Sequence, residues 1–401
     1  MNKLSVSHAG NCSNYLVFCS HNRNFASEMA GIYIHIPFCS SRCIYCGFYS
    51  TTALEQRQRY VDAVVKELEE RKSQGESEDE CIGTVYLGGG TPSQLTPSQL
   101  QQLFDAIHHT YKVETDAEIT MECNPDDITV EYAAALSQLP VNRVSMGAQT
   151  FSDERLRFLR RRHTSSQVTQ AVDTLRTAGI GNVSVDLMYG FPGETLNDWT
   201  DDIEAALALD AEHLSAYCLT IEEGTPLYQM FASDTAPICE EELERQMYEA
   251  LIDKLTAAGY EHYEISNFAK PGYRSRHNSS YWNGTPYLGI GAAAHSYNLK
   301  SRRWNVADII KYMEGIEQGH PRFEEEKIDN DTRYNDTVTV ALRTCEGIDL
   351  KALSPKHRDY CLRNARRFLD DHLLEHAGDY LRLTRRGLFV SDMVMSELIW
   401  I

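Results

Sequence analysis

The chain alternates short apolar runs with amphipathic segments from residue 31 onward. Runs of β-branched and other apolar residues predict six strands, over residues 32–36, 84–87, 118–122, 143–147, 183–188 and 213–219. Apolar positions three and four residues apart predict helices between them, over residues 54–72, 97–111, 130–139, 165–178 and 196–208. Cap residues such as Thr96 and Thr195 open two of these helices. Six β–α units in series predict an α/β fold with a parallel sheet, either doubly wound or curled into a partial barrel.

Polar and reactive residues follow the predicted strands at their carboxyl ends. A cysteine-rich loop follows the first strand and Gly88-Gly-Gly-Thr-Pro follows the second. Glu122-Cys-Asn-Pro ends the third strand, Gln149 follows the fourth, and Asp186 lies near the end of the fifth. Because parallel sheets bind ligands at this end of their strands, the sequence predicts one composite site there.

The rest of the chain predicts a smaller C-terminal domain and an irregular N-terminus. After a helix over residues 240–259, a stretch rich in Gly, Ser and Asn runs to residue 298. Residues 299–401 combine charged helices, a hairpin over residues 374–384 and a final helix, which predicts a winged-helix-like α+β domain. Residues 1–28 lack periodicity, so we expect a disordered extension, or an upstream start codon with Met29 as the true beginning. The core domain is thereby assigned to residues 29–298.

Composition argues against several classes of function. The hydrophobic content of 42% and charged content of 24% are those of a globular protein, and no run approaches the ~18 apolar residues of a membrane span. The formal net charge of −20 argues against a nucleic-acid-binding surface, so the basic run Arg363-Asn-Ala-Arg-Arg is interpreted as a solvated helix face. The 11 cysteines are not spaced like a disulfide framework, and we expect reduced thiols and a cytoplasmic protein.

Cys39, Cys43 and Cys46 carry the strongest chemical signal in the chain. Their spacing is C-x3-C-x2-C, directly after the first predicted strand. Three thiolates from one loop bind three irons of a 4Fe–4S cluster and leave the fourth iron open. S-adenosylmethionine (SAM) uses that opening, since its amino acid end chelates the iron and an electron from the cluster cleaves its sulfonium. Zinc is the alternative, but it needs a fourth Cys or His at matching spacing, and His35 lies on the wrong side of a Pro-Phe pair.

Residues near the cysteine loop supply candidate contacts to SAM. The glycines of Gly88-Gly-Gly allow main-chain groups to approach the methionyl amine and carboxylate closely. Glu122 suits a ribose hydroxyl or an ammonium group, and Arg161 suits the methionyl carboxylate, although its two neighbouring arginines fit equally by composition. Gln149 and Asp186 suit the ribose and the remaining polar groups.

A second candidate group lies in Ser275-Arg-His277-Asn-Ser-Ser-Tyr281-Trp282. An imidazole ligates haem iron, and aromatic rings four and five residues later in the sequence stack on a flat macrocycle. The alternative is a hydrogen-bonded histidine in a loop, with no ligand role.

Several of these motifs together resemble the radical SAM superfamily. They are Tyr33-Ile-His-Ile-Pro-Phe-Cys39, Gly88-Gly-Gly-Thr-Pro-Ser, Glu122-Cys-Asn-Pro, Arg143-Val-Ser-Met-Gly-Ala-Gln149 and Asp186-Leu-Met-Tyr-Gly-Phe-Pro-Gly. The resemblance covers roughly residues 30–390 and points to the oxygen-independent coproporphyrinogen III oxidases and their relatives. Within that group the chain is similar to the haem chaperones. Phe48 stands where the oxidases have a further cysteine, residues 1–28 do not resemble their longer substrate-binding segment, and His277-Asn-Ser-Ser-Tyr-Trp282 matches the HNxxYW signature of the chaperones.

The resemblance implies an incomplete (β/α)6 TIM-like barrel that holds a 4Fe–4S cluster on Cys39, Cys43 and Cys46. It also implies SAM contacts at eight residues: Tyr33, Gly89, Gly90, Thr91, Glu122, Gln149, Arg161 and Asp186. It further implies haem bound at His277, acceptor haemoproteins as partners, and a reductant such as flavodoxin or ferredoxin. No integral membrane span is expected, and transient membrane contact is left open.

Two other functions stay open on the sequence. The first is an oxidase, in which a 5′-deoxyadenosyl radical abstracts hydrogen from the propionates of coproporphyrinogen III before carbon dioxide is lost. Phe48 predicts that this activity is absent. The second is a radical enzyme that modifies nucleic acid through a winged-helix reader, against which the net charge of −20 argues.

Overall fold

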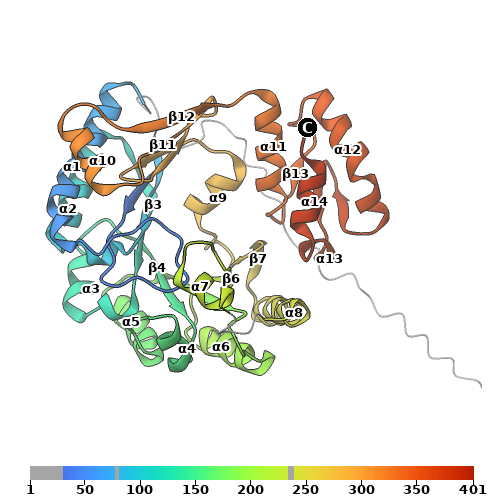
Figure 1. Cartoon of the computed structure of the whole chain (residues 1–401), viewed down its shortest axis with the longest axis horizontal. Coiled ribbons are helices and arrows are strands. Elements are labelled where there is room, and N and C mark those ends of the chain that lie inside the picture. Colours follow the sequence, from blue (N-terminus) through green and yellow to red (C-terminus); the bar gives the residue numbers. More distant parts are fainter. Residues whose placement is uncertain (1–29, 77–80, 234–238) are drawn as a thin grey trace, which may run out of the picture.

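The computed structural model describes residues 30–76, 81–233 and 239–401 (Figure 1). The predicted N-terminal extension over residues 1–28 lies outside the described residues. The largest element is a 12-stranded sheet in the order β12-β11-β10-β9-β1-β2-β3-β4-β5-β6-β8-β7. The six predicted strands form its parallel centre: β1 (Ala30–Ile36), β2 (Ile82–Gly89), β3 (Val113–Cys123), β4 (Arg143–Gln149), β5 (Asn182–Tyr189) and β6 (His213–Cys218). The sheet curls into an open barrel, which confirms the predicted fold class.

Helices connect the parallel strands and cover the outer face of the barrel (Figure 1). Five of them match the predicted helices: α1 (Arg57–Ser73), α2 (Pro97–Thr110), α3 (Val130–Leu136), α5 (Ser165–Thr177) and α6 (Leu196–Ala208). Short elements complete the connections: α4 (Asp153–Phe158), η1 (Leu54–Gln56), η2 (Pro92–Gln94) and η3 (Pro125–Asp127). Capping boxes at Thr96 and Thr195 satisfy main-chain N–H groups at the start of α2 and α6, as the cap residues predict. The apolar faces of the helices and strands form one continuous core.

The sheet extends beyond the six predicted strands at both edges. On the β6 side it adds β8 (Asn267–Ala269) and β7 (Glu261–Glu264). On the β1 side it adds β9 (Tyr287–Ile290), β10 (His295–Tyr297), β11 (Ser301–Asn305) and β12 (Phe323–Lys327). The prediction of charged helices was wrong for β11 and β12, whose charges pair across the strands, as in Arg302 with Glu326 at 2.9 Å. The predicted domain boundary at residue 299 therefore falls inside the large sheet.

The remaining helices of the barrel follow β6 in the chain and lie before or between these added strands. They are α7 (Pro226–Ala232), α8 (Glu241–Ala257), α9 (Arg276–Asn283) and α10 (Ile309–Glu317). Helix α8 was predicted, whereas α9 was not, because it is a short helix within a stretch rich in Gly, Ser and Asn. The Ser275 hydroxyl caps α9 at its start, and Gly284 ends it with a left-handed backbone at φ 76°.

Residues 330–401 form a separate α+β core beside the barrel (Figure 1). A three-stranded sheet, in the order β13-β15-β14, packs with four helices. The elements are α11 (Asn330–Ala341), β13 (Ile348–Asp349), α12 (Pro355–Asp370), β14 (Leu374–Ala377), β15 (Tyr380–Leu383), α13 (Arg385–Leu388) and α14 (Ser391–Leu398). The predicted hairpin is confirmed as β14 and β15. In the basic run on α12, Arg367 pairs with Glu397 of the same domain at 3.0 Å. None of the described helices has the length and apolar character needed to cross a bilayer.

Candidate functional site

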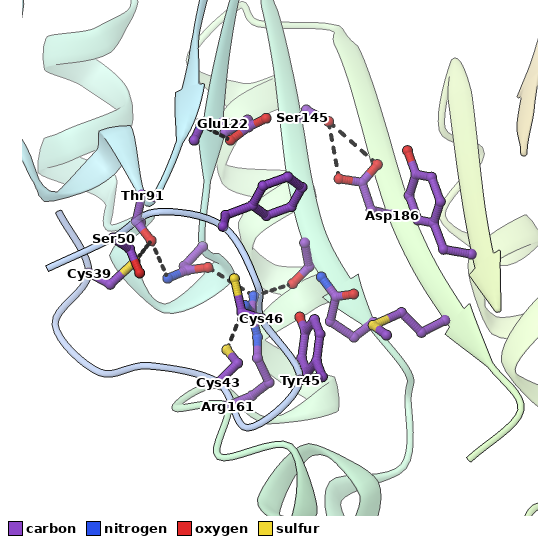
Figure 2. A pocket seen from close by; sticks show the side chains of 18 of the residues that line it. Cys39, Cys43, Tyr45, Cys46, Ser50, Thr91, Glu122, Ser145, Arg161 and Asp186 are labelled. Atoms are coloured by element: carbon purple, nitrogen blue, oxygen red, sulfur yellow. Dashed lines mark hydrogen bonds between the residues drawn. The ribbon is translucent and has the colours of Figure 1, made fainter. Parts of the chain in front are cut away.

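A cavity of about 470 Å³ opens at the carboxyl ends of the parallel strands. Each of β2 to β6 contributes lining side chains, and the cysteine loop after β1 forms one wall. Figure 2 shows the three cysteines on that loop, with Glu122, Ser145 and Asp186 across the cavity from them. The composite site expected from the strand ends is therefore present as one continuous cavity.

The cysteine loop presents its three thiols to this cavity without a disulfide among them. The Cys39 Sγ lies 3.5 Å from the Thr91 hydroxyl, and the Cys43 Sγ accepts a hydrogen bond from Arg161 at 3.6 Å. Burial raises the pKa of the Cys39 and Cys46 thiols above the usual value. Within the described residues no three Cys, His, Asp or Glu side chains converge on one ion position. A zinc site needs its ligands around a single ion, whereas a cluster takes each thiolate on a different iron.

Main-chain hydrogen bonds fix the cysteine loop against the turn that follows β2. The turn donates twice to the end of β1 and the residues after it, from Gly90 N to Ile36 O at 2.9 Å and from Thr91 N to Phe38 O at 2.8 Å. The loop also closes on itself, since Cys39 N donates to Thr51 O at 2.9 Å. Backbone pairing thus helps to set the position of the first cysteine, together with the fully buried Phe38 that precedes it.

Gly89 and Gly90 are required for this pairing. Gly89 has a φ of 104°, in the region that favours glycine, and a Cβ there would lie 2.3 Å from the His35 ring. A Cβ on Gly90 would lie 2.7 Å from the carbonyl oxygen of Ile36. Side chains at either position would push the turn away from the end of β1 and the start of the cysteine loop.

The Glu122 carboxylate is held at the end of β3 by two donors. It accepts hydrogen bonds from the Tyr86 hydroxyl at 2.8 Å and from Gly89 N at 3.0 Å. Burial, with the charge of Asp186 nearby, raises the pKa of Glu122 to about 7. The Glu122 carboxyl therefore changes its charge near neutral pH, and a cationic ligand beside it favours the ionised form.

Arg161 is distinguished from its neighbours by its contacts. Its guanidinium donates to Asn124 Oδ1 at 2.8 Å, to Gly147 O at 2.5 Å and to the Cys43 sulfur. Arg162 instead pairs with two aspartates beyond the third strand, Asp126 and Asp127, each at 2.8 Å. Arg160 adopts a left-handed backbone with a φ of 60° and is exposed. All three arginines line the cavity, and Arg161 is the one whose guanidinium reaches a cysteine of the loop.

Asp186 and Gln149 line the cavity at the ends of β5 and β4. The Asp186 carboxylate accepts a hydrogen bond from the Ser145 hydroxyl at 3.3 Å, and burial raises the pKa of this carboxyl. Gln149 is buried and has a φ of 69°, which turns the chain sharply after β4. Tyr33 does not line the cavity: its hydroxyl contacts His35 Nδ1 at 3.0 Å.

His277 lies inside the barrel wall rather than in the cavity. The ring is fully buried, with Nδ1 at 2.8 Å from the Thr84 hydroxyl and Nε2 at 2.9 Å from the Tyr281 hydroxyl. Burial, with the charge of Arg143 nearby, lowers the pKa of His277 to about 3, so the imidazole is neutral. Both ring nitrogens of His277 therefore have hydrogen-bond partners in this conformation. The residue that follows, Asn278, lines the cavity.

Some lining residues were not singled out from the sequence. They are Tyr86, Arg143, Ser145, Ser184, Ser215 and Tyr217. Arg143 had a readable signal, because a charged residue opened a predicted buried strand. The hydroxyl residues had none, since Ser and Tyr are ordinary in strands whose inner face meets a polar cavity.

Known proteins match the chain along nearly all of its length. The Radical SAM superfamily matches residues 33–206, and the HemN C-terminal domain matches residues 328–390. Heme chaperone HemW of Bacillus subtilis (strain 168) is 36% identical over 332 residues, which cover 82% of this chain and 87% of that protein. Heme chaperone HemW of Mycobacterium tuberculosis (strain ATCC 25618 / H37Rv) is 33% identical over 374 residues, which cover 92% and 94%. The chain belongs to the HemW family of radical SAM proteins.

A solved structure shows the same fold. Coproporphyrinogen III oxidase (HemN) from Escherichia coli, a radical SAM enzyme, matches with a TM-score of 0.81 over 93% of this chain and 90% of that chain. The sequences are 20% identical, so this likeness concerns the fold alone. It includes the C-terminal α+β domain as well as the partial barrel.

Replacing Gly90 with Ala should impair assembly of an iron–sulfur cluster on the cysteine loop. The added Cβ would meet the Ile36 carbonyl and displace the end of β1, at a cost of about 1–3 kcal/mol. Iron and sulfide analysis after anaerobic reconstitution should show clearly less cluster per chain than in the wild type. Gly181→Ala is the matched control, because no heavy atom lies within 4 Å of its Cβ. Full cluster content in Gly90→Ala would contradict the structural requirement.

Glu122→Gln should change how stability depends on pH. The folded chain holds the Glu122 proton up to about pH 7, against an ordinary value of 4.5, so ionisation costs stability progressively as the pH rises through this window. This loss of stability is absent below pH 4.5 and complete above about pH 7. The unfolding midpoint of the ligand-free variant should therefore gain on the wild type between pH 5 and pH 8. Glu55→Gln, at an exposed position, serves as the control, and a gain independent of pH would contradict the raised pKa.

Proposed function

We propose that this chain is a haem chaperone that carries a 4Fe–4S cluster and SAM and passes haem to acceptor haemoproteins. The observation that carries the proposal is the content of the cysteine loop. It supplies three cavity-lining thiols, and Phe48, at the position two residues further on, is 70% exposed and also lines the cavity. The relatives named as haem chaperones support the same assignment. We further propose a cytoplasmic location and a one-electron donor such as flavodoxin or ferredoxin.

The cluster would be held by Cys39, Cys43 and Cys46. The residues fit it, because all three thiols are half-buried, free of disulfides and placed beside a turn that has no side chains. When bound, the cluster supplies an electron to SAM at its open iron. The protein supports the thiolates with the Arg161 guanidinium at Cys43 and the Thr91 hydroxyl at Cys39.

SAM would occupy the space between the turn after β2 and the ends of the later strands. The main-chain N–H groups of Gly89, Gly90 and Thr91 already donate to Glu122, Ile36 and Phe38, so the turn would offer carbonyl oxygens to the methionyl amine. Arg161 would offer its cation to the methionyl carboxylate. Glu122, Asp186 and Gln149 supply acceptors and donors for the ammonium group and the ribose. Tyr33, which sits behind the cavity wall, would act by orienting His35 beneath Gly89.

Haem would meet the cavity where aromatic side chains are exposed. Phe48 and Tyr217 line the cavity and are 70% and 43% exposed, which is unusual for large apolar rings. Flat rings at the edge of a cavity suit a flat macrocycle, which buries its faces against them. His277 would reach the haem iron only in a conformation in which it has given up its hydrogen bond to Tyr281.

The competing function is an oxidase that decarboxylates coproporphyrinogen III. The side chain of Phe48 offers no sulfur ligand beside the cluster loop, so we expect no conversion to protoporphyrinogen IX by the reconstituted protein. Chromatography of anaerobic reactions with SAM and a chemical reductant measures this directly. Formation of protoporphyrinogen IX above the level of a variant with all three loop cysteines replaced by Ala would reject the proposed function.

The haem role of His277 is tested by two variants that act oppositely. His277→Ala removes the imidazole and should lower haem affinity and alter the absorption spectrum. Tyr281→Phe frees Nε2 while keeping the imidazole and should raise haem affinity. Thr84→Val, which frees Nδ1 instead, is the matched control for the loss of one hydrogen bond. Equal affinities and spectra in all four proteins would remove His277 from the ligand role.

A further inference from the structure

A buried arginine on the cavity wall has no hydrogen-bond or ion-pair partner in the part of the chain that the structure describes. Arg143 opens β4 and is 1% exposed, yet it lines the cavity. Its Nε is buried without a hydrogen-bond partner among the described residues. No carboxylate oxygen of the described residues lies within 4.0 Å of its guanidinium. The hydroxyl of Thr120, its register neighbour on β3, is buried and has no described partner either.

Two other arginines of the barrel interior differ from Arg143 in having partners for their terminal nitrogens. Arg71 is 2% exposed and its Nε also lacks a described partner, but its terminal nitrogens pair with Glu67 and Glu76 and donate to the Ser296 hydroxyl. Arg161 has an amide oxygen, a main-chain carbonyl and a sulfur as acceptors. A guanidinium left unpaired at such depth carries a large desolvation cost, which an anionic ligand offsets on binding.

The groups around Arg143 leave its charge uncompensated. His213 is hydrogen bonded at both ring nitrogens, to Ser184 and Tyr263, and burial, with the charge of Arg143 nearby, lowers its pKa. Asp186 is within electrostatic reach, but the hydroxyl of Ser145 donates to its carboxylate, and no ion pair with Arg143 forms. The start of β4 therefore places a cation beside neutral rings and hydroxyls, with the Asp186 carboxylate within electrostatic reach but not paired with it.

The ligand group for Arg143 differs from the carboxylate of SAM. Arg161 contacts the Gly147 carbonyl, whereas the main chain of Arg143 lies four residues earlier on the same strand, about 13 Å along β4. SAM has a single carboxylate, and when that carboxylate pairs with Arg161 it leaves none for Arg143. A second carboxylate must then come from the molecule that shares the cavity with SAM.

We propose that Arg143 forms a carboxylate subsite that receives a propionate of the porphyrin cargo. The identity of the cargo rests on the proposed function, whereas the existence of the subsite rests on Arg143 alone. A cavity of about 470 Å³ is largely filled by one ligand the size of SAM, so a narrow two-carbon arm ending in a carboxylate is the part of the cargo that fits beside it. Arg143 then selects porphyrins with free propionates.

The subsite is tested first with the carboxylate alone. Thermal unfolding of the full chain is followed with rising sodium propionate, at an ionic strength held constant with sodium chloride. The wild-type midpoint should rise, Arg143→Met should not respond, and Arg143→Lys should respond in part because it keeps the charge. Arg245→Met removes an exposed arginine and should respond like the wild type. Equal shifts of the unfolding midpoint in wild type and Arg143→Met would overturn the subsite. If Arg143→Met does not fold, an equal midpoint shift in wild type and Arg143→Lys overturns it instead.

The source of the carboxylate is tested with the cluster-reconstituted protein. The wild type should bind haem about tenfold more tightly than haem dimethyl ester, and Arg143→Met should lose this preference while it keeps its SAM affinity. A loss of SAM affinity with the ester preference intact would assign the carboxylate to SAM and overturn the cargo assignment. A wild type that binds no haem, but whose propionate response depends on Arg143, would reject the proposed function and leave the subsite standing.

Discussion

The backbone pairing between the cysteine loop and the turn after β2 is the constraint on which the site depends. Parallel register places Ile36 opposite Gly89, and the turn then donates to the chain just beyond β1. Only glycine at positions 89 and 90 allows the two segments to approach this closely. The same absence of side chains leaves the main chain beside the thiols open to a ligand. The close approach of the two segments thus helps to place Cys39 at the cavity that both glycines line.

Burial of polar groups gives the cavity its chemical character. Glu122 and Asp186 lie close enough to influence each other, and burial raises the pKa of both. A ligand with positive charge near these carboxyls stabilises their ionised forms, so its binding releases the Glu122 proton near neutral pH. The sulfonium and ammonium of SAM meet this description. Arg161 and Arg143, which line the same cavity, provide the opposite charge.

Sequence patterns predicted the centre of the fold and failed at its edges. The six parallel strands are apolar runs that both faces of the sheet bury, so their signal is strong. Strand β12, Phe323-Glu-Glu-Glu-Lys, is fully exposed and has a helical composition, and it is a strand only because β11 pairs with it. The cysteines and glycines were found because spacing alone identifies them. The hydrogen bonds of His277 and the uncompensated charge of Arg143 depend on residues far away in sequence, which spacing does not reveal.

Residues that hold an iron–sulfur cluster do not by themselves make a protein an enzyme. In the proposed function, the loop, the glycine turn and the acidic strand ends would hold a cluster and SAM. The features that address a second molecule are the exposed ring of Phe48 on the cysteine loop and the buried cation of Arg143. Since SAM and cargo would share one cavity, the affinity of each must depend on the other by the same factor. Such reciprocal coupling is sufficient to make SAM a regulator of haem retention and release, without any requirement that the cargo react.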